Sequence, residues 1–410
     1  MTDTSTAELR RALIQTPERR ASYDAFIMAY ETIDPAAAIL AARRSCVLDA
    51  TNRRIRGNLL YLLRANGLWA ELRAATPRRP RPLPPRRLHP VDIDAGVTLY
   101  DRLLDEMARR SGEGWTPSRV EVSKYRFPLD HTRLANFRRS EVSSGTQTVP
   151  DRPGDFPPLD FSRLYPDFTD AERSVLGSNL NRQFLGFLTR LYRRGAPGID
   201  WYEAAVADDD RFGARTVELP GVGTATAKSL QSAYYACRIA SLVPRGGVVL
   251  EIGGGFGAVA SRLLAIRPDV TYLLTDLPVN MVLTHTYLTS LYGEKVAGLW
   301  EDGDRAGDGK QAWMVPPWRL ASLPVRVDLA INTMSFQHMD ERNHAYYGAA
   351  MKALGTRRLY HLNRNVLRGD PASDTMVVPA ERYGFMADYK VVESTDFDGD
   401  WIEVIADSSN

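Results

Sequence analysis

Three closely spaced glycines are the residues of this sequence best suited to hold a bound nucleoside. Gly253, Gly255 and Gly257 follow an apolar run at 248–250 and precede a segment with helical spacing. Glycines allow positive φ angles and let a ligand approach the backbone without meeting a Cβ atom. The free amides at the N-terminus of the following helix would point at a ligand above the turn. The pattern therefore predicts a nucleotide or nucleoside pocket at a strand-to-helix turn.

Two carboxylates near these glycines separate the possible cofactors. The glycine spacing alone also fits the dinucleotide pattern G-x-G-x-x-[GA]. Glu251 stands two residues before Gly253, where a carboxylate is unfavourable for a pyrophosphate and suits the ammonium of an amino acid moiety. Asp276 lies 19 residues after Gly257, at the end of the next expected strand, where it can bind both hydroxyls of a ribose. Together with a terminal hairpin, these features favour S-adenosyl-L-methionine over NAD.

The elements that must position these residues form a parallel α/β sheet. From Gly213 onward, short apolar runs alternate with segments of helical spacing, which is typical of this fold class. We expect a helix over 226–242 and strands at 248–252, 271–276, 312–316, 327–332 and 358–363. Two further β-like runs, 389–393 and 401–405, flank a turn-rich segment and predict an antiparallel hairpin.

Three segments of this region resemble the motifs of class I S-adenosyl-L-methionine-dependent methyltransferases: Glu251-Ile-Gly-Gly-Gly-Phe-Gly257, Thr275-Asp-Leu-Pro278 and Asp328-Leu-Ala-Ile-Asn-Thr-Met-Ser-Phe-Gln337. More closely, they resemble the sugar O-methyltransferase family found in bacterial glycan and natural-product gene sets. The resemblance covers residues 213 to 410. It implies a Rossmann-like, seven-stranded α/β sheet with a reversed last strand and the cofactor over the ends of the first two strands. It also implies an acceptor held by the fourth and fifth strands and the N-terminal region.

The chemistry of methyl transfer indicates a general base. Transfer from a sulfonium is an in-line displacement, so the enzyme must hold the acceptor oxygen, the methyl carbon and the sulfur nearly collinear. A sugar hydroxyl gains from a base that removes its proton as the bond forms, and histidine has a pKa near neutrality. His338 follows the fourth strand, at the edge where ligands bind, and we expect it to be this base. The alternative is a partly exposed histidine before a helix that Asp340 caps.

The remaining site candidates are chosen by their positions at the ends of elements. Further cofactor contacts are expected from Tyr234, Leu277 and Asn332. Acceptor contacts are expected from His361, Asn363 and Arg364. Core packing, or a strand end satisfied by its own polar side chains, is the alternative for these residues. Asp340 and Glu341 are also what a helix N-terminus prefers, and we expect no metal site.

The N-terminal half has a different organisation. We expect a helical region at 1–75, a linker at 76–90, a mostly helical cap or lid at 91–212 that includes a helix over 91–111, and the methyltransferase domain at 213–410. The linker holds the run PRRPRPLPPRRLHP, whose prolines forbid a helix and whose arginines keep it solvated. A spacer is the favoured interpretation, and binding of an acidic partner or a diphosphate is the alternative. The N-terminal helices are expected to form a homodimer or substrate-capping surface, and a small helical core is the alternative.

Composition limits the classes of partner. The chain has 410 residues, 44% of them hydrophobic, and a formal net charge of +2, so its overall charge gives no strong attraction to nucleic acid or anionic membranes. No segment reaches the roughly 18 apolar residues of a membrane span. Two distant cysteines argue against a disulfide framework, and we expect a cytoplasmic protein.

The function that these features predict is methyl transfer from S-adenosyl-L-methionine to a hydroxyl of a sugar or glycosylated natural-product-type small molecule. One alternative keeps the cofactor and methylates a nitrogen or carbon of a peptide or other small molecule. Another is an NAD-dependent oxidoreductase that uses the same glycine turn, and a third is a non-catalytic binding protein without cofactor affinity.

Overall fold

The structure is a computed structural model of the chain. It describes residues 27, 34–48, 58–59, 61–63, 66–67, 89–110, 115–117, 129–140, 180, 183–184, 186–187, 190–191, 202, 205–214, 216–219, 222–293, 297–301, 304, 310–365, 379–397 and 401–409. These residues group into two compact units. Unit 1 draws on the chain up to residue 83 and on 168–209 and 216–241, and unit 2 on 84–167, 210–215 and 242–410. The predicted cap region, 91–212, thus contributes to both units.

Unit 1 contains the helix that precedes the first strand of the main sheet in sequence. This helix, α12 (Ala227–Ala240), confirms the helix predicted over 226–242. A capping box fixes its start: Ser229 N donates to Thr226 Oγ1 and Thr226 N donates to Ser229 Oγ, each at 2.9 Å. The unit also holds α3 (Pro35–Leu48) and two antiparallel strands, β1 (Val217–Leu219) and β2 (Gly223–Ala225). These strands were not predicted, because three residues are too few to show a period of two.

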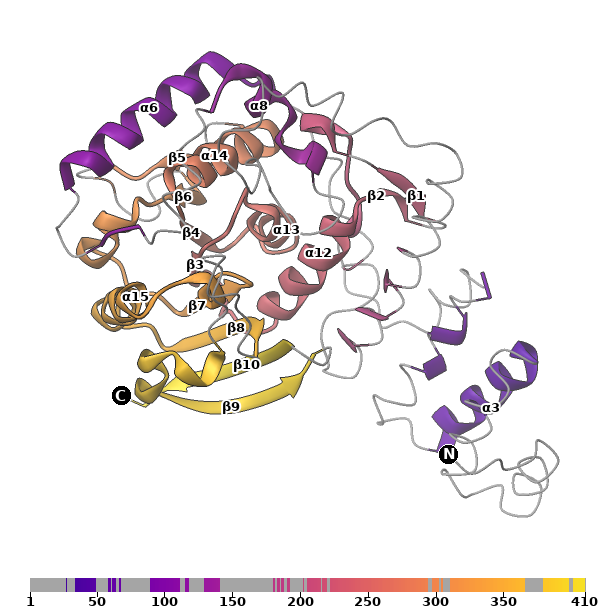
Figure 1. Cartoon of the computed structure of the whole chain (residues 1–410). Helices are drawn as coiled ribbons and strands as arrows, with labels where there is room; N and C mark the ends of the chain where they lie inside the picture. Colours follow the sequence, from indigo (N-terminus) through magenta and orange to yellow (C-terminus); the bar gives the residue numbers. More distant parts are fainter. Residues whose placement is uncertain are drawn as a thin grey trace, which may run out of the picture. The chain divides into compact units, whose positions relative to one another are not determined.

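Unit 2 is built on an eight-stranded, mostly parallel sheet (Figure 1). In spatial order its strands are β5 (Ala297–Leu299), β6 (Ala312–Met314), β4 (Thr271–Thr275), β3 (Val248–Ile252), β7 (Leu329–Thr333), β8 (Arg358–Arg364), β10 (Trp401–Ser408) and β9 (Tyr389–Asp396). The strands from β5 to β8 run parallel, and β10 is antiparallel to both of its neighbours. The parallel sheet, the reversed strand and the terminal hairpin strands are therefore confirmed.

The expected count of seven strands is wrong by one, because β5 adds an edge strand beside β6. Its sequence, Ala-Gly-Leu, is too short and too poor in β-branched residues to indicate a strand. The other strands agree with the predicted ranges to within a few residues. The central strands are buried along nearly their whole length, with burial on both faces at Val249, Leu250 and Ile252 of β3. Burial on both faces explains why their sequences are continuous apolar runs.

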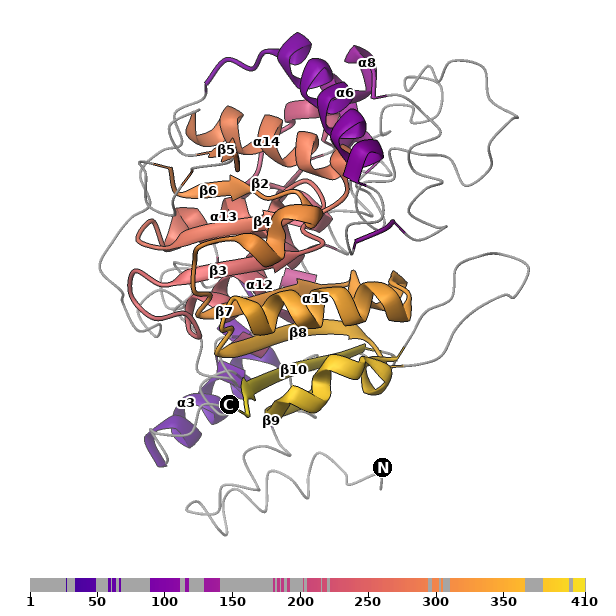
Figure 2. The same ribbon diagram turned by 90° about the vertical axis from the view of Figure 1, so that its left-hand side faces the viewer.

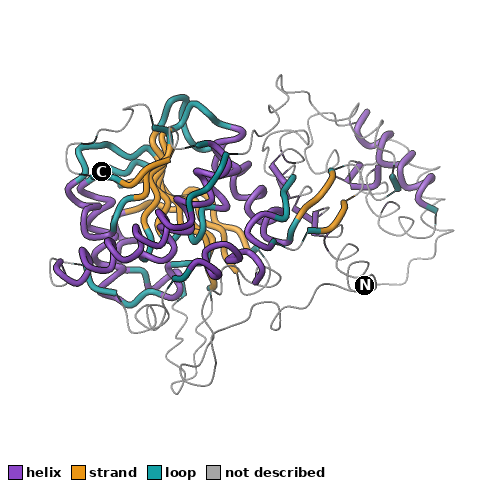
Figure 3. Tube along the Cα trace, turned by 90° about the horizontal axis from the view of Figure 1, so that it is seen from above, coloured by secondary structure: helices purple, strands orange, loops and turns teal. Residues whose placement is uncertain are grey.

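Helices cover both faces of this sheet (Figures 1 and 3). In Figure 1, α13 (Ala258–Ile266) lies on one side of the strands and α15 (Glu341–Ala353) on the other. α14 (Pro278–Tyr292) follows β4 and is almost entirely buried. The shorter helical elements are α8 (His131–Asn136), η2 (Phe137–Ser140), η3 (Arg211–Gly213), η4 (Pro317–Ser322), η5 (Phe336–His338), η6 (Ala380–Arg382) and η7 (Gly384–Asp388).

One helix from the N-terminal half packs against this sheet domain. α6 (Ile93–Arg110) confirms the helix predicted over 91–111 and runs along α14 (Figure 2). Its buried side includes Tyr100 and Leu103, as expected for an amphipathic helix on a core. A Cβ atom added at Gly96 would lie 2.5 Å from Leu134 Cδ2 of α8, so glycine permits the close approach of these two helices. α6 is therefore part of unit 2.

Several predictions fall on residues outside the described part of the chain. Of the predicted linker, 76–90, only His89 and Pro90 are described, and His89 N donates to Ser290 O at 3.0 Å. Most of the 1–75 region is also outside it, so a homodimer through the N-terminal helices stays a prediction. Among the residues that are described, no helix is long and apolar enough to cross a membrane.

Candidate functional site

The glycine turn joins β3 to α13 at the carboxyl edge of the parallel sheet. Gly253, Gly255 and Gly257 all have positive φ angles, of 75°, 61° and 81°. A Cβ atom at Gly253 would lie 2.0 Å from Ser335 Oγ, in the loop after β7, so both the backbone conformation and the space require glycine there. Gly253 N donates to Thr275 O at 2.8 Å. The turn is thus tied to the end of β4 and packs closely against the loop that follows β7.

Glu251 lies beneath this turn. Its side chain is fully buried, and Tyr272 donates its hydroxyl to Glu251 Oε2 at 2.7 Å. A Cβ atom at Gly254 would lie 2.7 Å from the same oxygen, so the carboxyl group supports the underside of the glycine turn. Burial and the Glu251 carboxylate raise the pKa of Tyr272 well above its usual value, which keeps the phenol a donor. The expected contact of Glu251 with an ammonium group stays a prediction.

Asp276 connects the end of β4 to the glycine turn. Its Oδ2 accepts a hydrogen bond from Gly255 N at 2.7 Å, and its Oδ1 accepts from Leu277 N at 2.7 Å and Asn280 Nδ2 at 2.9 Å. The residue is 8% exposed. Hydrogen bonds to a carboxylate from backbone amides are about twice as strong as neutral ones. The predicted pair, glycine turn and Asp276, is therefore brought together, with a carboxylate held at the mouth of the turn.

A network of side-chain amides joins the ends of three neighbouring strands. Asn332 Nδ2 donates to Ile252 O at 2.7 Å, and Asn332 Oδ1 accepts from Asn363 Nδ2 and Phe336 N, each at 3.0 Å. Asn363 Oδ1 accepts from Gln337 N at 3.4 Å. The side chains of Asn332, Asn363 and Gln337 are all buried. The network fixes the ends of β3, β7 and β8 and the start of η5, which carries His338. The expected contacts of Asn332 with cofactor and of Asn363 with acceptor stay predictions.

His338 is exposed at the end of η5, as the alternative interpretation of this histidine expected. The side-chain carbonyl of Gln337 accepts from Arg364 N at 2.8 Å, which turns the Gln337 amide nitrogen toward His338 Nε2 at 3.0 Å. Because an amide nitrogen only donates, Nε2 accepts and the neutral ring carries its proton on Nδ1. The lone pair on Nε2 makes the ring competent as a base. The preceding turn contains Met334 with a φ of 64°, a conformation that costs energy outside glycine.

Arg364 lies beside this histidine at the end of β8. Its backbone amide orients Gln337, and its guanidinium carbon lies 4.8 Å from the centre of the Trp401 ring. That distance is within the range of a cation–π interaction. The side chain is partly exposed, and its expected contact with an acceptor stays a prediction.

His361 lies inside the sheet, two residues before Asn363 on β8. It is fully buried, and among the described residues neither ring nitrogen has a hydrogen-bond partner. The centre of the Tyr383 ring lies 5.9 Å from that of His361. Burial lowers the pKa of His361 to about 4, so the ring is neutral at pH 7. This position makes His361 part of the sheet interior, and its predicted role in acceptor binding remains untested.

The buried neutral His361 predicts acid sensitivity of the fold. Its pKa is 6.5 in the unfolded chain and about 4 in the folded one, so between these values the unfolded state binds more protons. Stability is therefore lost as the pH falls from about 6.5 to 4, by roughly 3 kcal/mol for this residue. The free energy of unfolding is measured with urea at pH 7 and at pH 4.5. Its decrease between these two pH values should be smaller for His361→Leu than for the wild type. The remaining acid sensitivity includes His344, whose pKa is also lowered by burial. An equal loss in both proteins would contradict this account.

Two predicted cofactor residues have different settings. Leu277 is 4% exposed, adjoins Asp276 and precedes Pro278, the first residue of α14. Tyr234 belongs to α12 in unit 1, where it is fully buried and its ring centre lies 5.3 Å from that of Phe187. Both contacts with a cofactor stay predictions.

In the described part of the chain, no group of three His, Cys, Asp or Glu side chains could hold a metal ion. Asp340 acts as the N-cap of α15, accepting from Asn343 N at 2.9 Å. Although burial raises it, this hydrogen bond and the Arg342 guanidinium hold the pKa of Asp340 below its usual value. The Asp340 side chain thus caps the N-terminus of α15.

Sequence reasoning missed several residues that shape the site: Tyr272, Asn280, Ser335 and Gln337. Tyr272 was identifiable in part, because it lies in the predicted strand on the face shared with Leu274, the register partner of Glu251. Asn280 stands four residues after Asp276, in the first turn of α14. Ser335 and Gln337 gave no such signal, because their partners come from distant strands.

The sequence matches no protein-family model and no curated protein. Among solved structures, it is similar to the pyocyanin biosynthetic protein PhzM, with 15% identity, 45% of this chain and 56% of that chain covered, and a TM-score of 0.32. It is also similar to the mitomycin 7-O-methyltransferase MmcR, with 13% identity, 45% and 57% coverage, and a TM-score of 0.32. A third similar structure is the glycopeptide N-methyltransferase MtfA complexed with S-adenosyl-L-methionine. It has 15% identity and a TM-score of 0.30, with 43% of this chain and 86% of that chain covered. The match spans little more than half of the first two proteins.

Proposed function

We propose that the chain is an S-adenosyl-L-methionine-dependent methyltransferase that transfers a methyl group to a hydroxyl of a sugar or glycosylated small molecule. The observation that carries this proposal is the Asp276 carboxylate, 2.7 Å from Gly255 N at the mouth of the glycine turn. This arrangement suits a ribose diol beside a main chain that admits close approach. The reversed strand β10 also distinguishes the sheet from two parallel dinucleotide-binding halves.

The donor and acceptor groups of the turn fit the proposed cofactor. Asp276 offers carboxylate oxygens to ribose hydroxyls, and the glycine turn leads into the N-terminus of α13. Leu277 adds apolar surface beside Asp276. The carboxyl group of Glu251, under the turn, is better suited to an ammonium group than to a pyrophosphate. S-adenosyl-L-methionine, when bound, supplies the electrophilic methyl group of its sulfonium.

The chain's own residues then account for activation of the acceptor. We assign His338 Nε2 as the atom that takes the proton of the acceptor hydroxyl. The bound cofactor would supply the methyl group, with its carbon–sulfur bond breaking and S-adenosylhomocysteine leaving. Gln337 already donates to this nitrogen at 3.0 Å, so the acceptor hydroxyl must replace the Gln337 amide as the hydrogen-bond donor. The buried network of Asn332, Asn363 and Gln337 keeps η5 in place during this exchange. Positioning of this kind supplies much of the rate in a bimolecular displacement.

Isothermal titration calorimetry with S-adenosylhomocysteine and with NAD tests the proposal directly. We expect saturable binding of S-adenosylhomocysteine and none of NAD. Binding of NAD alone would instead support an oxidoreductase, and binding of neither would support a non-catalytic protein. If only S-adenosylhomocysteine binds, mass spectrometry of products from sugar, amine and peptide acceptors then separates O-methylation from N- and C-methylation.

A further inference from the structure

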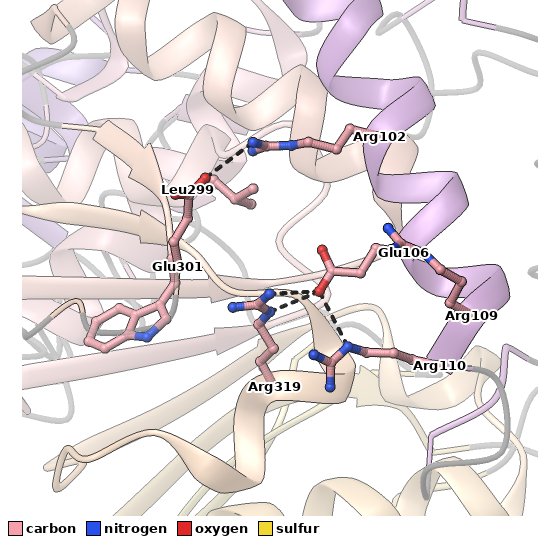
Figure 4. A pocket seen from close by; sticks show the side chains of 8 residues that line it. Arg102, Glu106, Arg109, Arg110, Leu299, Glu301 and Arg319 are labelled. Atoms are coloured by element: carbon pink, nitrogen blue, oxygen red, sulfur yellow. Dashed lines mark hydrogen bonds and ion pairs between the residues drawn. The ribbon is translucent and has the colours of Figure 1, made fainter.

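An arginine-lined pocket of about 450 Å³ lies in unit 2 and shares no lining residue with the glycine turn. Its walls come from α6, from the end of β5 and from η4, which follows β6 (Figure 4). The lining residues are Arg102, Glu106, Arg109, Arg110, Leu299, Trp300, Glu301 and Arg319. Figure 4 shows Arg102 and Arg110 extending from α6 toward the side formed by Glu301 and Arg319, whereas Arg109 lies along the helix. Four arginines and two glutamates leave the lining with an excess of positive charge.

The inner part of the pocket contains a network of ion pairs around Glu106. Arg319 Nη2 donates to Glu106 Oε1 at 2.8 Å, and Arg110 Nε lies 3.5 Å from the same oxygen. The side chains of Glu106 and Arg319 are only 15% and 16% exposed. Although burial raises it, hydrogen bonds from Trp318 and Arg319 hold the pKa of Glu106 below its usual value. The Glu106 carboxylate thus contacts the guanidinium groups of both Arg110 and Arg319 at the inner end of the pocket.

Within the described residues, the two outer arginines, Arg102 and Arg109, make only exposed interactions. Arg102 pairs with Glu301 at 3.2 Å, but the two side chains are 53% and 61% exposed, and such pairs contribute little. Arg109 is exposed, and its Nε donates to the backbone carbonyl of Asp105 at 3.2 Å. Both side chains can thus turn toward an anion without breaking a buried interaction.

We propose that this pocket binds a dianionic phosphoryl group carried by a small molecule. A phosphate monoester has a charge of about −1.5 to −2 at pH 7, which matches the surplus of the lining. Guanidinium groups bind phosphate oxygens in bidentate pairs. The volume is that of a small-molecule site, larger than a phosphate ion needs, and Leu299 and Trp300 offer apolar surface to an organic part.

The order of the strands separates this pocket from the proposed methyl acceptor. β5 and β6 lie on one side of β3, whereas β7 and β8 lie on the other. His338 belongs to η5, which follows β7, and Asn363 belongs to β8. The phosphoryl site is therefore an additional site, and its existence does not depend on the proposed methyl transfer.

Calorimetry of the full chain at constant ionic strength tests the site. The probes are inorganic phosphate, ribose 5-phosphate and, as a neutral control, ribose. We expect both phosphates to bind saturably and ribose not to bind. The double variant Arg102→Gln/Arg109→Gln should weaken phosphate binding by about tenfold or more, while its thermal midpoint stays near that of the wild type. Arg357→Gln is the matched control, because it removes an exposed arginine of unit 2 that pairs with Asp328 at 3.5 Å.

Each outcome decides a separate point. Tighter binding of ribose 5-phosphate than of inorganic phosphate supports an organic phosphate as the ligand, whereas equal affinities would overturn the small-molecule part of the proposal and indicate a site for the phosphate ion alone. The proposal is overturned if neither phosphate binds, if Arg357→Gln weakens binding as much as the double variant, or if only an oligonucleotide binds. Because no methyl donor is present, these results stand whether or not S-adenosylhomocysteine binds.

Discussion

Asp276→Ala is expected to remove measurable binding of S-adenosylhomocysteine. The carboxylate is the proposed acceptor for the ribose hydroxyls, and a hydrogen bond to a charged group contributes about 1.5–3 kcal/mol. Gly255 N, Leu277 N and Asn280 Nδ2 already occupy three of the roughly four acceptor positions of this carboxylate, so the loss of one such bond corresponds to a decrease in affinity of about tenfold to a hundredfold. The substitution also removes the acceptor for Gly255 N, now 2.7 Å from Oδ2, and so frees the glycine turn. Calorimetry with S-adenosylhomocysteine measures the effect.

Two further variants separate recognition of the ligand from damage to the fold. Asp276→Asn keeps the size of the side chain and removes its charge, so we expect an intermediate affinity. Asp407→Ala removes a carboxylate that pairs with Arg358 at 2.6 Å, at the start of β8 and thus at the opposite edge of the sheet. It should leave the affinity unchanged. If Asp276→Ala binds S-adenosylhomocysteine as tightly as the wild type, the nucleoside does not lie over this turn.

The sheet was predictable from sequence because its strands are buried on both faces. Val248–Ile252 and Leu329–Thr333 are apolar runs that only a two-sided interior explains. β5 escaped prediction because a three-residue strand that includes Gly298 gains its stability from pairing with β6 rather than from its own propensity. The packing of α6 on α14 was also beyond prediction, since an apolar stripe does not identify its partner.

The site was predictable only to the level of position along a strand. Asp276, Asn332 and Asn363 follow strands that end at one edge, and this placed them near each other. Their partners depend on tertiary contacts: Asn332 bonds Asn363, 31 residues away, at 3.0 Å. His361 shares a face with Asn363 by the period of two, yet its burial depends on Tyr383, which precedes η7. Spacing in the sequence predicts the face of the sheet on which a side chain lies. The residues that pack over that face come from distant parts of the chain, and spacing does not identify them.

His338→Ala is expected to lower methyl transfer by about two to four orders of magnitude, the range for loss of a general base. Because Nε2 accepts from Gln337 at 3.0 Å, the ring presents an unprotonated nitrogen without a change of tautomer. The exposed position of the ring leaves it accessible to an acceptor, as a base for a small-molecule hydroxyl must be. Turnover is measured with S-adenosyl-L-methionine and a sugar acceptor selected by product mass spectrometry.

Comparison of kcat with affinity then distinguishes a base from a binding residue. A lost base lowers kcat at saturating acceptor and leaves the affinity for S-adenosylhomocysteine intact, whereas a lost contact raises KM. His131→Ala is the matched control, since His131 is an exposed histidine of unit 2 whose Nε2 lies 2.6 Å from Asp94 Oδ1 on α6. Its turnover should equal that of the wild type. Unchanged kcat in His338→Ala would exclude His338 as the base and leave Gln337 and Arg364 as groups that orient the acceptor.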